Sequence, residues 1–240
     1  MPKKKLGMFE QRELFIAGCK FIERARKKYC GSSFDVFGID PSISSTGYVY
    51  RKVGEEVKTG VIVQKTYGFS RLVRTEILLK KAIGDKKFFV GLEDYAYGSK
   101  WGREQMGELG GVIRRLLYKK RLPMLTVSPT TLKAWLRAKQ KSQIMLEILD
   151  RYKIKISNED AADAFVLADI VYNAIHLAND VVINNLNSED VRLYLKNENY
   201  KTRVPLKKLY KYQANSLFRL IFVHGVNCEF FLKSKPTLEV

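Results

Sequence analysis

Four acidic residues have the type and setting that metal-assisted cleavage of a phosphodiester requires. Asp40 and Glu93 each end a short, almost entirely apolar run. Asp160 and Asp163 lie three residues apart in an alanine-rich segment. Hydrolysis of a phosphodiester needs an activated water and a stabilised leaving oxygen, and two hard cations about 3.5–4 Å apart provide both. Since Mg²⁺ prefers oxygen ligands, the four carboxylates predict a site for two Mg²⁺ ions.

Each acid also has a purely structural interpretation. Asp40 directly precedes a proline and is typical of a turn. Glu93 is compatible with a solvated strand end, and Asp160 and Asp163 can stabilise the start of a helix through its dipole. Taken singly, the structural interpretation is favoured at each position. Taken together, in a strongly basic chain, the four acids favour a metal site.

The charge of the chain indicates an anionic partner. The 240 residues include 43 Lys or Arg and 25 Asp or Glu, which gives a net charge of +18. Residues 111–155 carry twelve basic residues against two acids, whereas residues 156–170 carry four acids and no base. A basic surface around a small acidic island suits a nuclease, because bases hold the phosphates and acids hold the cations. The expected partner is nucleic acid.

Several other classes are disfavoured by composition. The three cysteines show no CxxC spacing and there are only two histidines, which argues against a disulfide framework or a zinc site. The N-terminus lacks the apolar core of a signal peptide, and no run approaches a membrane span. The expected protein is soluble and intracellular, in the cytoplasm or inside a host cell, with no membrane partner and no small-molecule cofactor.

The pattern of apolar residues predicts an α/β fold. The predicted strands are 34–39, 46–52, 57–63, 87–92 and 122–127, with a hairpin turn at 54–56. The predicted helices are 9–29, 69–83, 103–120, a helix opened by Ser128 and Pro129, 142–151, and 158–178 after Ser157. Three meandering strands followed by alternating strands and helices predict a mixed five-stranded sheet with helices on both faces.

This arrangement brings the acids together. Asp40 and Glu93 lie at the carboxyl ends of two predicted strands, where ligands gather in sheets of this kind. Asp160 and Asp163 share one face of the last clear helix. The small alanines beside them allow that helix to lie close against the sheet.

Two extensions flank this predicted core. We divide the chain into an N-terminal helical extension (1–33), a nuclease domain (34–178) and a C-terminal extension (179–240). The last is predicted to be helical, including 188–196 and 206–223. No internal repeat is present.

The motifs resemble those of a known family. They are, in chain order, Gly38-Ile39-Asp40-Pro41 continuing through Ser45-Thr46-Gly47-Tyr48, then Val90-Gly91-Leu92-Glu93, Lys141-Ser142-Gln143 and Glu159-Asp160-Ala161-Ala162-Asp163-Ala164. Over residues 34–178 the chain resembles the RuvC Holliday-junction resolvases. The resemblance implies an RNase H-like fold, a homodimer, and Mg²⁺ or Mn²⁺ as cofactor. It also implies that Asp40 bridges both metal ions, that Glu93 and Asp163 complete the two sites, and that Asp160 assists.

The resemblance extends to DNA contacts, with some departures. Lys133 and Lys141 match lysines that contact the phosphate backbone in the family. The family places an aromatic residue just after its second acid, whereas this chain has Ala96 there. The predicted DNA contacts are Lys133, Lys141, the flanking Tyr95 and Tyr97, and Arg114 and Arg115 from the basic segment. The long extensions mark a divergent member, for which a viral origin is one interpretation.

The function predicted from the sequence is resolution of four-way DNA junctions by paired, metal-dependent hydrolysis. A branched-DNA or flap nuclease of the same fold is the alternative among enzymes. A catalytically inactive DNA-binding module is a second alternative, although a binding protein gains nothing from acids that face phosphates. A third alternative is a structural interaction protein, for which the net charge offers little support.

Overall fold

A five-stranded mixed sheet forms the centre of the computed structural model, which describes residues 8–52, 54–94, 103–138, 140–191 and 211–224. The strands are β1 (Val36–Pro41), β2 (Ser45–Arg51), β3 (Lys58–Val63), β4 (Phe89–Glu93) and β5 (Met124–Val127). Their order is β3-β2-β1-β4-β5. β2 pairs antiparallel with β1 and β3, while β4 is parallel to β1 and to β5. The predicted mixed sheet is confirmed.

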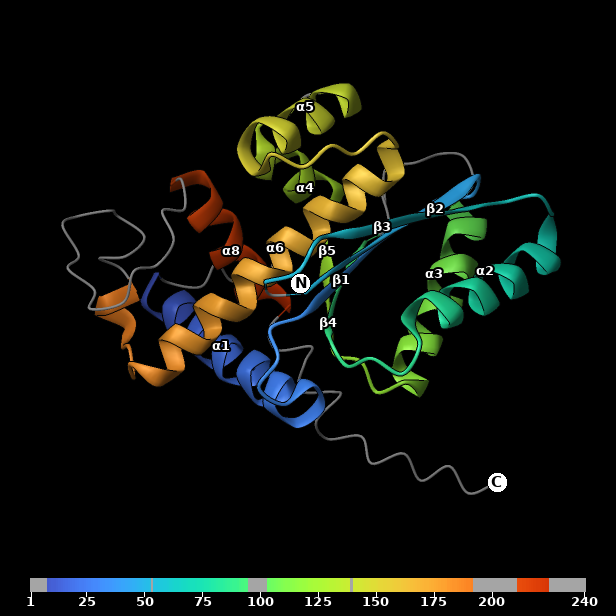
Figure 1. The fold of residues 1–240 in the computed structure, drawn as a ribbon. Helices are drawn as coiled ribbons and strands as arrows, with labels where there is room; N and C mark the ends of the chain where they lie inside the picture. The colour runs from blue at the N-terminus through green and yellow to red at the C-terminus, as the bar shows by residue number, and fades with distance from the viewer. Residues whose placement is uncertain (1–7, 53, 95–102, 139, 192–210, 225–240) are drawn as a thin grey trace, which may run out of the picture.

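Helices cover both faces of this sheet, as predicted (Figure 1). One face carries α2 (Gly68–Ile83) and α3 (Arg103–Lys119). The other carries α6 (Glu159–Ile183), which lies across the sheet with the remaining helices around it. These are α1 (Met8–Cys30), α4 (Pro129–Leu136), α5 (Lys141–Tyr152) and α8 (Lys211–His224).

Some element boundaries differ from the predicted ones because local capping sets them. The side chain of Asn158, and not Ser157, caps α6 by accepting a hydrogen bond from the Ala161 amide at 3.0 Å. α6 also extends five residues beyond the predicted end at 178, because its apolar side chains continue into the core. Of the predicted 188–196 helix, residues 188–191 are helical and the rest lies outside the described residues. Of the predicted 206–223 helix, residues 211–223 are helical and belong to α8, whereas 206–210 lie outside the described residues.

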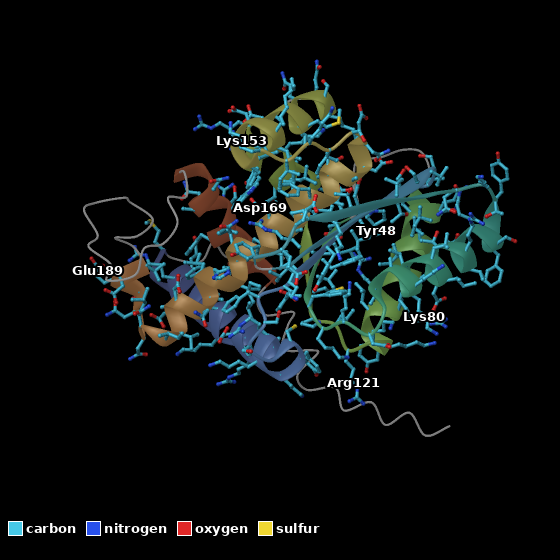
Figure 2. All side chains as sticks on the ribbon, viewed as in Figure 1. Tyr48, Lys80, Arg121, Lys153, Asp169 and Glu189 are labelled. Carbon is cyan, nitrogen blue, oxygen red and sulfur yellow. The ribbon has the colours of Figure 1, made fainter. Side chains whose placement is uncertain are left out.

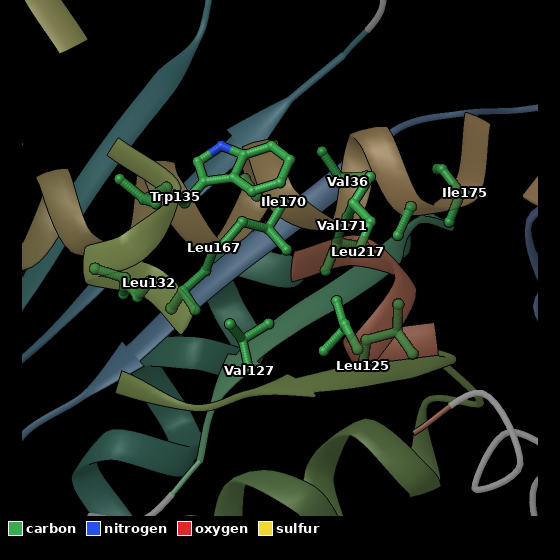
Figure 3. Packing of buried hydrophobic residues seen from close by; sticks show 14 of the residues in the cluster. Val36, Leu125, Val127, Leu132, Trp135, Leu167, Ile170, Val171, Ile175 and Leu217 are labelled. Atoms are coloured by element: carbon green, nitrogen blue, oxygen red, sulfur yellow. The ribbon is translucent and has the colours of Figure 1, made fainter. Parts of the chain in front are cut away.

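The strands alternate between two hydrophobic cores. Phe37, Ile39 and Leu92 point into the core under α2 and α3. Val36, on the opposite side of β1, packs in the core around α6. Figure 3 shows this second core, where Trp135 of α4 and Leu217 of α8 pack with side chains of α6. Alternation along the strand therefore also fixes which face each acid at a strand end must occupy.

Three glycines allow α6 to lie directly on the sheet. A Cβ atom on Gly38 of β1 would lie 1.9 Å from the carbonyl oxygen of Ala164, and one on Gly47 of β2 would lie 2.0 Å from that of Asp160. A Cβ atom on Gly91 of β4 would lie 2.7 Å from the α6 backbone. Because α6 carries two of the candidate acids, these contacts determine how far those acids lie from the strands.

α6 is the one helix of the described chain that is long and apolar enough to cross a membrane by length and composition. The expectation that no run approaches a membrane span is wrong in this sense. The helix packs against β1, β2 and β4 on one side and against α1 on the other. Its apolar character on nearly all sides is that of a helix in the centre of a core.

Parts of both predicted extensions share the core around α6. Phe15 of α1 stacks on Phe218 of α8 with ring centroids 4.9 Å apart, and both helices contact α6. Ile22 of α1 and Ile221 of α8 are fully buried in the same cluster. The division of the chain at residues 33 and 178 stays a prediction, but the described helices of both extensions contribute to one core with the sheet.

Candidate active site

Asp40 and Glu93 meet at the carboxyl ends of two adjacent parallel strands. The register pairs Gly38 with Gly91 and Ile39 with Leu92, which places the two acids next to each other. In each strand the acid follows a glycine by two residues, so both acids lie on the face that α6 covers. The two carboxyl groups are hydrogen bonded to each other.

Burial raises the pKa of both carboxyl groups. Asp40 is only 4% exposed, and burial followed by the contact with Glu93 raises the pKa of Asp40 well above its usual range. Burial also raises the pKa of Glu93, and the charge of Asp163 adds to this increase. Two adjacent buried carboxylates repel each other unless a proton or a cation lies between them. The pair is therefore a favourable place for positive charge.

The first turns of α6 bring Asp160 and Asp163 to the same edge of the sheet. Asp163 is buried, its Oδ1 has no hydrogen-bond partner, and its Oδ2 lies 3.3 Å from Nζ of Lys141. Burial raises the pKa of Asp163, whereas the Lys141 charge opposes that shift. Asp160 accepts a hydrogen bond from the Ser45 hydroxyl and lies 3.5 Å from Nζ of Lys141.

Three of the four predicted acids open into one cavity. Its volume is about 390 Å³, and Asp40, Glu93 and Asp163 line it together with Lys133 and Lys141. Asp160 is not among the lining residues, because its carboxylate turns toward β2. The sequence predicted all four acids in one site, with Asp160 only assisting, and it gave no indication of the contact between Asp160 and Ser45 of β2.

Lys133 and Lys141 reach the cavity from two helices with well-defined starts. Ser128 caps α4 by accepting a hydrogen bond from the Thr131 amide at 3.2 Å, with Pro129 in the first helical position. Lys141 is the first residue of α5. Burial favours a lower pKa for Lys141, but the charges of Asp163 and Asp40 outweigh it and raise the pKa. Lys141 is therefore a stable cation held by the acidic residues.

The other predicted DNA contacts are less uniform. Arg114 of α3 forms an ion pair at 3.2 Å with Asp94, the residue after Glu93, and so supports the edge of the site. Arg115 is largely exposed and lies 3.9 Å from Glu76 of α2. Tyr95 and Tyr97 lie outside the described residues.

Asp169 is a structurally important residue of the site that the sequence analysis did not single out. It is buried near the middle of α6 (Figure 2) and accepts three short hydrogen bonds. The donors are Arg51 Nη1 at 2.6 Å, Trp135 Nε1 at 2.8 Å and Tyr152 Oη at 2.6 Å. These bonds tie β2, α4 and α5 to α6, and α4 and α5 carry the two lysines of the cavity. In the sequence, the indication of this role is that Asp169 is an isolated acidic residue in an otherwise apolar part of the predicted 158–178 helix.

The donor atoms fit a hard cation, although their arrangement is incomplete. Within the described part of the chain, no three Asp, Glu, His or Cys side chains form a ready metal-binding cluster. Lys141 lies between the two acids of α6. The ligand set consists of carboxylate oxygens, one of them buried and without a partner on Asp163. That chemistry suits Mg²⁺ or Mn²⁺ and not a softer metal.

The strand order, with β2 as the one strand antiparallel to the other four, is that of an RNase H-like α/β fold. The structure is similar to that of Thermus thermophilus RuvC in complex with a Holliday junction substrate, with 18% identity, a TM-score of 0.49, and 60% of this chain and 94% of that chain covered. A second Thermus thermophilus RuvC structure gives 18% identity and a TM-score of 0.48, covering 60% and 95%. No protein-family model matches the sequence, and no curated protein matches it significantly.

Proposed function

We propose that this protein is a metal-dependent DNA endonuclease that resolves four-way junctions. The observation that carries the proposal is the cavity in which Asp40, Glu93 and Asp163 meet beside two lysines. Asp40 and Glu93 form a buried carboxyl pair in direct contact, and Oδ1 of the third acid, Asp163, has no hydrogen-bond partner. This arrangement is energetically costly unless cations bind there. Lysines at the rim favour a substrate that brings phosphates to those cations.

Each residue has a distinct task in this proposal. Asp40, Glu93 and Asp163 hold two Mg²⁺ ions, for which Mn²⁺ can substitute, and Asp160 assists from the side of β2. When bound, the ions supply an activated water and stabilise the leaving oxygen. Lys133 holds the phosphate backbone from α4. Lys141 must release the Asp163 carboxylate for that group to bind a cation, and it then becomes available to a phosphate.

We further propose that the enzyme acts as a homodimer. Symmetrical cleavage of a four-way junction requires two active sites related by a twofold axis, which an isologous dimer provides. The outer surface of α2 and of the residue before it is compatible with such an interface, since Tyr67, Phe69 and Ile77 are 89%, 78% and 60% exposed. Sedimentation of wild type and of an Ile77→Lys variant tests this, and a wild-type chain that stays monomeric on junction DNA contradicts it.

The decisive experiment compares DNA substrates. Purified protein is incubated in Mg²⁺ with synthetic four-way junctions, flaps and linear duplexes, and the products are mapped on both strands. We expect paired, ligatable cuts in the junction and little cutting of the duplex. Preference for flaps would support the broader branched-DNA nuclease. Binding without cleavage in either Mg²⁺ or Mn²⁺ would support the alternative of a catalytically inactive DNA-binding module.

A further inference from the structure

Arg71 of α2 is a buried cation that no acid of the described chain neutralises. The residue is 6% exposed, its Nη2 donates to Oε1 of Gln105 at 3.4 Å, and its Nε has no partner. Within the described ranges no ion pair includes it, and residues 95–102, which join β4 to α3, contain no acidic residue. Because arginine does not lose its proton, its buried charge favours an anion from outside the described residues.

The surroundings of Arg71 are polar and incompletely hydrogen bonded. Thr75, one turn later in α2, receives a hydrogen bond of 2.5 Å from Nε2 of Gln64. Thr46 of β2 pairs with the residue two before Gln64, so both face α2. The Thr46 hydroxyl and Oε1 of Gln64 are buried without partners. We call Thr46, Gln64, Arg71, Thr75 and Gln105 the Arg71 cluster.

The N-terminus of α2 also favours a nearby anion. The helix has no side-chain cap at its N-terminus and no acidic residue in its first turn. Arg71 is its fourth residue, so the unpaired amide groups of the first turn lie close by in the chain. Gln105 is exposed, so the guanidinium end of Arg71 lies beside a solvent-accessible side chain.

The Arg71 cluster lies at the same edge of the sheet as the cavity, on the opposite face. Thr46 pairs directly with Pro41, the residue after Asp40. Gln105 precedes Met106, which lines the cavity. The cluster and the cavity are therefore adjacent in the fold, joined through the ends of β1 and β2 and through the start of α3.

We propose that the Arg71 cluster binds a backbone phosphate of the DNA strand whose neighbouring phosphodiester enters the cavity. The planar guanidinium and a hydroxyl donor suit a phosphate oxygen geometrically. A carboxylate from another protein chain would also balance the charge, but the net charge of +18 and the adjacent cavity favour phosphate. The assignment to DNA rests on the proposed function, whereas binding of the anion itself does not.

A thermal-unfolding experiment without metal tests the anion site. Wild type, Arg71→Met and Arg74→Met are melted in chloride and in inorganic phosphate at equal ionic strength. Arg74, on the exposed side of the same helix, is the matched control. We expect Arg71→Met to melt at or above the wild-type temperature in chloride and to lose most of the rise in Tm that phosphate produces, while Arg74→Met keeps that rise. A lower Tm in chloride with the full phosphate response would overturn the proposal.

A binding experiment then tests the DNA assignment. The affinity for a four-way junction is measured against salt in Ca²⁺ for the same three proteins. We expect Arg71→Met to lower the slope of log K against log salt by about 0.9, one phosphate contact. An unchanged slope, together with an altered sedimentation coefficient, would assign the anion to a partner carboxylate and overturn the phosphate site. The cleavage assay on wild type judges the proposed function separately.

Discussion

At the scale of single residues, the neighbours of each acid decide its role. Asp40 shares a hydrogen bond with Glu93, Asp163 faces Lys141, and Asp160 is held by Ser45. The first two contacts leave negative charge in a buried cavity, where a low effective dielectric strengthens its interaction with cations. The third anchors α6 to β2. The four acids are therefore expected to differ in their sensitivity to substitution.

Replacement of Asp40 by asparagine is expected to abolish cleavage while junction binding stays near normal. The variant loses the central charge of the carboxyl pair, and we expect a loss of cleavage rate of at least about 10²–10³-fold. Cleavage and gel-shift assays on the same preparation measure both. Asp150→Asn, on the exposed side of α5, is the matched control. Near-normal cutting by Asp40→Asn would remove the active site from this cavity.

Addition of Mg²⁺ is expected to raise the melting temperature of wild type and not that of Asp40→Asn. A cation that binds only the folded state stabilises it by mass action. It also relieves the repulsion between the buried carboxylates. Differential scanning fluorimetry against Mg²⁺ concentration measures the shift. An equal shift in both proteins would place the cation at another site.

The two cavity lysines are expected to differ in their contribution to DNA binding. Lys133→Ala should weaken junction binding and lower the slope of log K against log salt by about 0.9. Without a divalent metal, Lys141→Ala should weaken binding with a smaller change of slope, because Asp160 and Asp163 balance the Lys141 charge. In Ca²⁺, which displaces Lys141 from Asp163, its change of slope should approach that of Lys133→Ala. Salt titrations with and without Ca²⁺ measure these slopes. Wild-type slopes in both variants would place these lysines away from the DNA.

At the scale of elements, the contact of α6 with the sheet positions the site. Gly38, Gly47 and Gly91 leave the strand surface free of side chains, and the α6 backbone fills that space. Asp169 then ties α4 and α5 to the same helix through three hydrogen bonds. The acids and the cavity lysines thus depend on one helix and on the partners that hold it.

Gly38→Ala is expected to reduce both stability and cleavage. The new methyl group would lie 1.9 Å from the Ala164 carbonyl oxygen, so α6 must move away from β1. Overpacking of this kind costs about 1–3 kcal/mol of unfolding free energy. The control is Gly107→Ala in α3, whose added Cβ meets nothing within 4 Å. Chemical denaturation and cleavage assays compare them, and wild-type activity in Gly38→Ala would show that the spacing is not critical.

Asp169→Ala is expected to lower the free energy of unfolding by about 3 kcal/mol, since it leaves the Arg51 charge without its partner. Tyr152→Phe removes a single donor and should cost only about 1 kcal/mol. The fluorescence of Trp135, isolated by Trp101→Phe, should change in Asp169→Ala because its indole loses an acceptor. Equal losses of unfolding free energy in Asp169→Ala and Tyr152→Phe would show that the Asp169 carboxylate does no more than accept one hydrogen bond from Tyr152.

At the scale of the whole molecule, residues outside the predicted nuclease domain complete the core. Phe15 and Ile22 of α1 and Leu217 and Ile221 of α8 are buried with side chains of α6. Removing both helices would expose that apolar surface to water, and the loss of burial is unfavourable. The basic extensions suit either DNA binding and the dimer or cover of the core, and the packing of α1 and α8 against α6 favours cover.

A truncated chain of residues 31–180 is therefore expected to aggregate or to unfold at much lower denaturant concentration. Light scattering and denaturation against the full chain measure this. A control that removes only residues 225–240 should remain folded. If the 31–180 chain is folded but binds junctions poorly, the extensions are recognition elements. Junction-selective cutting at the full rate by that chain would show that they serve neither role.

The sequence by itself determined the strands, the helices and the strand-end positions of Asp40 and Glu93. Alternation of side chains and helical periodicity are local properties, so the apolar pattern around Gly38 and Gly91 specifies which face each acid occupies. The tertiary structure alone decided that Asp160 turns to Ser45, that Asp169 joins three elements to α6, and that Arg71 has no acidic partner among the described residues. Those pairings join residues up to 118 positions apart. They depend on how helices pack across the sheet, which no local pattern encodes.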